Sequence, residues 1–114
     1  MPNKDFTKFQ EHFKKYQHRF GLMGYQVYFK YEPIDVFADI TCNLTNMIAT
    51  VRLNSKLPEK DKPYKGNKRT AKHEAIHLLI MRLENNARYR YSTDVDITES
   101  VEELTIKLEE LIGD

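Results

Sequence analysis

The sequence predicts an α+β fold: an N-terminal helix, a small three-stranded and mostly antiparallel sheet, and two C-terminal helices, all in one domain over residues 1–114. Three observations predict it. The chain has 114 residues, which is enough for one hydrophobic core and too few for two. Apolar residues recur every three to four positions towards both ends and every second position between them. Hydrophobic residues make up 40% of the chain, and only 4 Gly and 4 Pro interrupt it, which is typical of a folded domain.

The order of the elements follows from the spacing of apolar residues. Aromatic residues three and four positions apart predict the first helix, which Gly21 and Gly24 end. Alternating apolar and polar residues predict strands, two of them forming an antiparallel hairpin beside the first. We expect a helix over 5–20, strands over 25–31, 36–42 and 47–53, a lysine-rich loop over 54–68, a helix over 70–85, irregular structure over 86–94 and a helix from Thr98 onward.

Charge and cysteine content exclude several classes of protein. The 18 Lys and Arg residues nearly balance the 17 Asp and Glu residues, whereas a dedicated nucleic-acid-binding domain carries a clear basic excess. Cys42 is the only cysteine, so the chain has no internal disulfide and no cysteine-ligated zinc site, and a reducing cytoplasm is expected. The longest apolar run, residues 75–81, is too short to cross a bilayer, and we expect no membrane association.

Residues 73–77 read His-Glu-Ala-Ile-His and match the H-E-x-x-H pattern inside a predicted helix. Residues four apart on a helix point in nearly the same direction, so His73 and His77 can bind one metal ion. Glu74 lies about 100° around the helix from His73, where its carboxylate can take a proton from a metal-bound water. Imidazoles at the edge of an apolar stripe also need partners for their nitrogen atoms. The pattern therefore predicts a zinc site.

A catalytic zinc site needs a third protein ligand and one open position for water. No histidine follows His77 and Cys42 stands alone on a strand, so the third ligand is expected to be a carboxylate. The last predicted helix offers Glu99, Glu102 and Glu103, and its expected apolar face consists of Val101, Leu104, Leu108, Leu111 and Ile112. Glu102 lies on the flank of that face and is favoured. Glu99 and Glu103 point further towards solvent and stay as alternatives, and Glu103 is also placed to pair with Lys107.

These residues resemble a known group of enzymes. A His-Glu-x-x-His helix followed by a glutamate on the next helix is similar to the gluzincin branch of zinc metallopeptidases, above all to its very small members, called minigluzincins, and to compact metallopeptidases encoded by bacteriophages. The resemblance implies that His73, His77 and Glu102 bind one Zn²⁺ and that Glu74 is the general base. It also implies a short sheet over the active-site helix, whose edge strand, 47–53, holds an extended peptide.

The function that the resemblance implies is a hydrolase that cuts peptide bonds of a peptide or protein substrate, through a metal-bound water activated by Glu74. Two departures stand beside it: residues 98–103 do not follow the Asn-Glu-x-x-Ser-Asp pattern of larger gluzincins, and the third histidine of SprT-like proteases is absent. The candidate oxyanion donors lie between the ligand helices and are Arg88, Tyr89, Arg90 and Tyr91. This run is too short to predict stacking on nucleic acid.

The alternative function is a non-catalytic, zinc-stabilised binding or regulatory module, for instance a phage factor that binds a host protein. Such a module has no need of Glu74, so this residue separates the two hypotheses. In either case the expected location is the cytoplasm, or the host cytoplasm for a phage-encoded protein.

Overall fold

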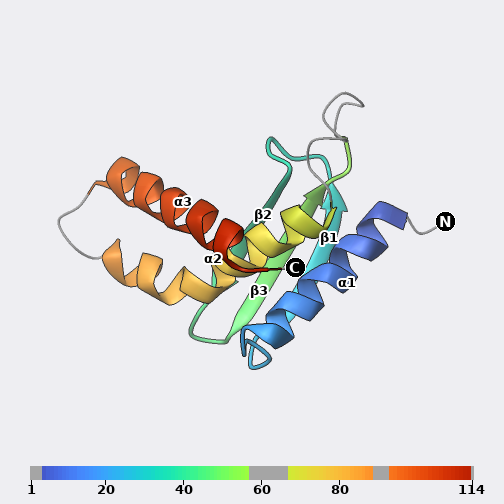
Figure 1. Cartoon of the computed structure of the whole chain (residues 1–114), viewed down its shortest axis with the longest axis horizontal. Helices are drawn as coiled ribbons and strands as arrows, with labels where there is room; N and C mark the ends of the chain where they lie inside the picture. The colour runs from blue at the N-terminus through green and yellow to red at the C-terminus, as the bar shows by residue number, and fades with distance from the viewer. Residues whose placement is uncertain (1–3, 57–66, 89–92, 114) are drawn as a thin grey trace.

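The computed structural model describes residues 4–56, 67–88 and 93–113 (Figure 1). Along the chain its elements are α1 (Lys4–Arg19), β1 (Gln26–Glu32), β2 (Ala38–Asn43), β3 (Ile48–Asn54), α2 (Asn67–Ala87) and α3 (Asp94–Leu111). The predicted α+β class and the order of the elements are confirmed. Most of the predicted lysine-rich loop, and residues 89–92 of the predicted irregular segment, lie outside the described residues.

The three strands form a mixed sheet in the order β1-β3-β2. The expected hairpin is present, since β2 pairs with β3 in antiparallel register, but β1 pairs with β3 in parallel. The prediction of a mostly antiparallel sheet is therefore wrong for one of the two pairings. The prediction that 47–53 forms the edge strand is also wrong, because β3 lies in the centre. Ala49 and Val51 of β3 are completely buried. A strand with a fully apolar inner face is best shielded from water at the centre of the sheet.

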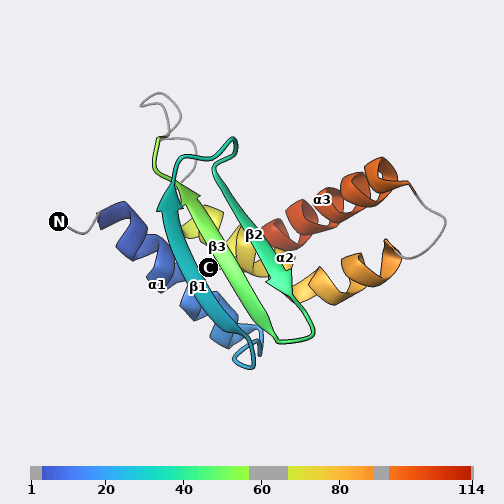
Figure 2. The same cartoon turned by 180° about the vertical axis from the view of Figure 1, so that it is seen from behind.

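One face of the sheet is covered by helices, and no element within the described residues covers the opposite face (Figures 1 and 2). Between the two layers lies the core, which consists of Phe9, Phe13 and Tyr16 from α1, Ala38 from β2, Ala49, Val51 and Leu53 from β3, and Ala71, Ala75 and Leu78 from α2. The uncovered face is polar. On it, the Arg52 guanidinium pairs with the carboxylates of Asp39 and Glu32 on the two neighbouring strands.

The helix α1 is joined to β1 by a tight connection that its own last turn stabilises. Nε2 of the buried Gln17 donates to the carbonyl oxygens of Leu22 and Tyr25, at 2.9 and 3.0 Å. Gly21 has φ +74°, a conformation that side chains with a Cβ disfavour. The predicted helix end at Gly21 is thus explained by the backbone, and the turn directs β1 back under α1.

The second half of α2 and the whole of α3 form a helical hairpin that extends beyond β2 (Figure 1). The helix α3 begins at Asp94 instead of the expected Thr98, because Thr93 caps it: its hydroxyl accepts a hydrogen bond from the backbone N–H of Asp96 at 3.1 Å. The predicted apolar face of this helix is wrong in part, since Val101, Leu108 and Ile112 are half-buried but the other two residues are not. Leu104 and Leu111 are 38% and 80% exposed, whereas the polar Thr105 and Glu109 are buried.

Candidate metal centre

The two motif histidines lie on α2, on the side that faces α3. The opposite side of the same helix carries Ala75 and Leu78, which are buried in the core and hold the helix in place. The side chains of His73 and His77 are 18% and 14% exposed, so both imidazoles are largely withdrawn from water without being closed off. Their ring centroids lie 4.9 Å apart. The helix therefore presents both rings as one unit, as the four-residue spacing predicted.

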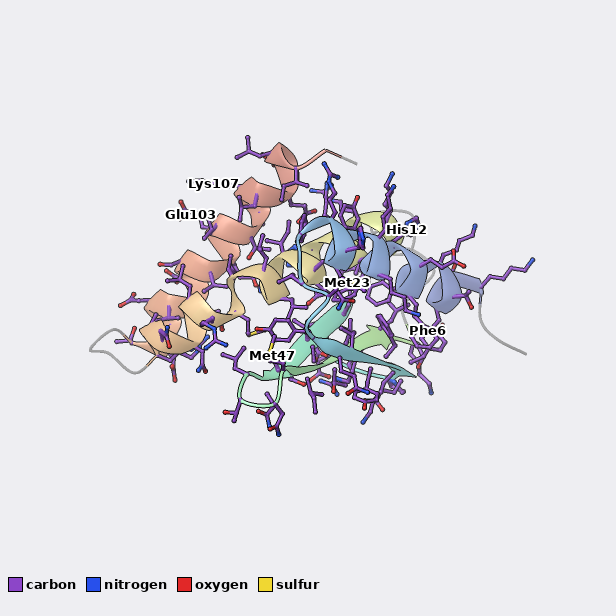
Figure 3. The ribbon with its side chains drawn as sticks, turned by 90° about the horizontal axis from the view of Figure 1, so that it is seen from below. Phe6, His12, Met23, Met47, Glu103 and Lys107 are labelled. Carbon is purple, nitrogen blue, oxygen red and sulfur yellow. The ribbon has the colours of Figure 1, made fainter. Side chains whose placement is uncertain are left out.

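Of the three candidate glutamates on α3, the structure brings Glu102 to the histidines. One carboxylate oxygen of Glu102 lies 2.9 Å from Nε2 of His77 and the other lies 3.6 Å from Nε2 of His73. One ligand atom from each of the three residues lies within 4.8 Å of those of the other two, so the group could hold a metal ion. Glu99 is exposed to solvent. Glu103 pairs instead with Lys107 at 2.7 Å, as expected, on the outer face of α3 (Figure 3).

A further carboxylate, which the sequence analysis missed, supports the first histidine. Glu109 of α3 is buried, and its two oxygens lie 2.7 Å from Nδ1 of His73 and 2.6 Å from Nε of Arg69. Burial raises the pKa of Glu109, but the hydrogen bonds from His73 and Arg69 outweigh it and leave the pKa below its ordinary value. An ionised carboxylate only accepts, so His73 donates through Nδ1–H and turns Nε2 towards Glu102.

The missed signal was a spacing within α3. Glu109 follows Glu102 by seven residues, which is two helical turns, so both carboxylates lie on one side of the helix. That side is polar, and a helical wheel that seeks the apolar face assigns it to solvent. Its carboxylates pack against α2 because their partners, Arg69, His73 and His77, are spaced four residues apart and so lie on one face of that helix.

The surroundings of the second histidine lower its pKa. Burial lowers the pKa of His77, and the positive charge of a protonated His73 acts in the same direction, against the opposing effect of the Glu102 carboxylate. A neutral imidazole is the form that binds metals. The lowered pKa of His77 therefore favours the form that offers Nε2 as a ligand.

These side chains lie in an open cleft of about 640 Å³ between α2, α3 and the edge strand β2. Glu74, 5% exposed, lies in its wall beside the histidines. Apolar side chains line much of the rest, among them Val36, Phe37, Ile40, Met81, Val101 and Ile106. The cleft thus places a buried carboxylate next to a possible metal site, within reach of an extended molecule lying along β2.

Of the four predicted oxyanion donors, Arg88 lies within the described residues and the other three lie outside them. Arg88 also lines the cleft, but its guanidinium is held by Glu84 at 2.8 Å and by Asp94 at 3.0 Å. Ion pairing with Glu84 and Asp94 raises its pKa further. The structure therefore shows Arg88 linking the ends of the two ligand helices.

Searches against protein-family models, curated proteins and solved structures found no match to this chain. Among the helices within the described residues, none is both long and apolar enough to cross a membrane.

Proposed function

We propose that the protein is a zinc-dependent peptidase with His73, His77 and Glu102 as metal ligands and Glu74 as the general base. The observation that carries the proposal is the convergence of Nε2 atoms and a carboxylate from two helices in an open cleft, with Glu74 buried beside them. A structural metal site has no use for that fourth residue. A catalytic one does.

The residue types at the site support zinc as the metal. Ligand atoms about 2.1 Å from a tetrahedral ion are about 3.4 Å from one another. Here one ligand atom from each of the three residues lies within 4.8 Å of the others, and the two oxygens of Glu102 approach His77 and His73 at 2.9 and 3.6 Å. Two nitrogens and one oxygen are also a ligand set typical of catalytic zinc, which keeps its fourth position open. Glu109 supplies the outer hydrogen bond that usually orients a ligating histidine.

Zinc held there would polarise a peptide carbonyl and make a bound water more acidic. The chain's own residues do the rest. Glu74 takes the proton of the attacking water and delivers it to the departing amine, for which a carboxylate in a largely dry wall is suited. His73 and His77 stay neutral ligands, and Glu109 keeps the ring of His73 in the tautomer that this requires.

The substrate we propose is an extended peptide that adds to the outer edge of β2, which pairs with no other strand of the described residues. The sequence predicted that strand 47–53, now β3, would bind the peptide. Because β3 is central, its backbone groups are already paired on both sides, so we assign peptide binding to β2 instead. One edge of β2 is paired with β3 and the strand borders the cleft. Backbone hydrogen bonds to a strand edge hold peptides of many sequences, and the apolar wall of the cleft favours apolar side chains next to the cut bond.

The test combines zinc content with hydrolysis of a mixture of unstructured peptides. We expect about one zinc per chain in the wild type and in Glu74→Gln, with hydrolysis abolished only in the variant. The matched control, Glu103→Gln, removes a surface carboxylate that pairs with Lys107 and should cut as the wild type does. Full hydrolysis by Glu74→Gln would refute the mechanism. Zinc binding without any hydrolysis by the wild type would favour the non-catalytic module.

A further inference from the structure

The helix α3 is attached to the molecule through α2. It packs against α2 and has at most marginal contact with any other described element. Three of its residues are buried, Ile97, Thr105 and Glu109, and of these only Ile97 is apolar. The helix α1, by contrast, buries the aromatic residues Phe9, Phe13 and Tyr16, together with Gln17. Burial of apolar surface is the main source of docking free energy, so the docking of α3 is weak in this respect.

The apolar seam between α2 and α3 is also open to solvent. A groove of about 280 Å³ runs along it, with Leu83 of α2 and Leu104 of α3 among its lining residues. Leu83 is 64% exposed, so much of the surface that could hold the two helices together stays in water. An open seam between helices forfeits the close packing that makes a helix pair stable.

Polar contacts take the place of this missing core. Near the tip of the hairpin, Arg88 pairs with an Asp94 side chain that is 88% exposed, and such surface pairs contribute little. The better-buried contacts gather at the candidate metal centre, where Glu102 faces both histidines and Glu109 binds His73. Two of the three proposed ligands belong to α2 and the third belongs to α3.

We infer that the metal ion docks α3: with zinc bound, α3 is held against α2, and without it α3 opens while α1, the sheet and α2 stay folded. The inference rests on the proposed metal centre. Opening separates Glu102 from the histidines and so destroys the site, which links opening to release of the ion. Free zinc at 1,000 times its Kd would then lower the opening equilibrium of α3 about 1,000-fold.

Amide hydrogen exchange of the full chain, metal-free and with zinc chloride, tests this inference. Zinc should slow exchange over 94–111 by about 100- to 1,000-fold and leave β3 and α1 nearly unchanged. Glu102→Gln, which cuts the link from α3 but keeps the histidine pair, should lose most of this effect. The matched control Glu99→Gln changes an exposed carboxylate on the same helix and should respond as the wild type does. Exchange in α1 and β3 reports in each variant whether the core is folded.

The outcomes separate the two proposals. Zinc bound at one per chain, with exchange over 94–111 unchanged, overturns the docking role and leaves the peptidase proposal standing. No binding of zinc by the wild type overturns both. Equal slowing throughout the molecule also overturns the inference, because α3 would then open only when the whole chain unfolds.

Discussion

Replacing Glu109 by Gln is the sharpest test of how the metal centre is oriented. The carboxylate of Glu109 is 7% exposed and accepts from His73 at 2.7 Å and from Arg69 at 2.6 Å. The amide of Gln has a similar shape but one acceptor oxygen, so it can serve one of the two donors and turns an NH₂ group towards the other. The substitution thus removes charge and one hydrogen bond without leaving a cavity.

How much stability Glu109→Gln loses depends on which of the two contacts of Glu109 is shielded from water. Arg69 is 63% exposed, so water replaces Glu109 there at little cost. His73 is 18% exposed, and a buried hydrogen bond to a charged group contributes about 1.5–3 kcal/mol. With one acceptor left, we expect the free energy of unfolding of the zinc-bound protein, in which α3 is docked, to fall by at least about 1–2 kcal/mol. Loss of such an outer partner also weakens metal binding by about 10- to 100-fold.

Competition with a chromophoric chelator measures the Kd for zinc, and urea unfolding measures stability. Glu110→Gln is the matched control, because this neighbouring carboxylate is exposed; neither quantity should change in it. If Glu109→Gln binds zinc as tightly as the wild type, Glu109 does not orient His73 and the assignment of its tautomer is wrong.

Three further predictions concern the fold. Phe13→Ala removes a completely buried ring and should lower the free energy of unfolding in urea by about 3–5 kcal/mol; a loss under 1 kcal/mol would contradict the core described above. Gly21→Ala should cost about 1–2 kcal/mol because φ there is +74°, while Gly113→Ala, with open space and no such φ, should cost almost nothing; equal effects would count against backbone strain. Burial raises the pKa of Cys42, although Arg82 opposes this. The thiolate therefore forms at higher pH in the folded than in the unfolded chain, and iodoacetamide should modify native Cys42 more slowly at pH 8; an equal rate in urea would contradict this.

The elements that sequence predicted well are those whose pattern is local. The spacing of aromatic residues in α1, the alternation in the strands and the His-Glu-x-x-His pattern in α2 each repeat within one element, and the structure has all of them within a few residues. The start of α3 was predicted too late because the apolar pattern begins well after Thr93, the residue that caps the helix. Glu102 was favoured over Glu99 and Glu103, and the structure brings it to the histidines, although two of the five residues of the apolar face used to rank it are exposed.

Sequence by itself determined which side chains can act together on one helix: His73 and His77 as a pair, with Glu74 beside them. The reason is that helical spacing is set by the backbone alone. Tertiary structure alone decided that β2 is the edge strand at the cleft, and that Glu109 supports His73 across 36 residues of chain. Those outcomes depend on which surfaces pack against one another. The strand β3 buries Ala49 and Val51 in the centre of the sheet. The helix α3 turns its polar side to α2 because the residues that bind its carboxylates lie on α2. A helix that docks through its carboxylates is one whose position a metal ion can control.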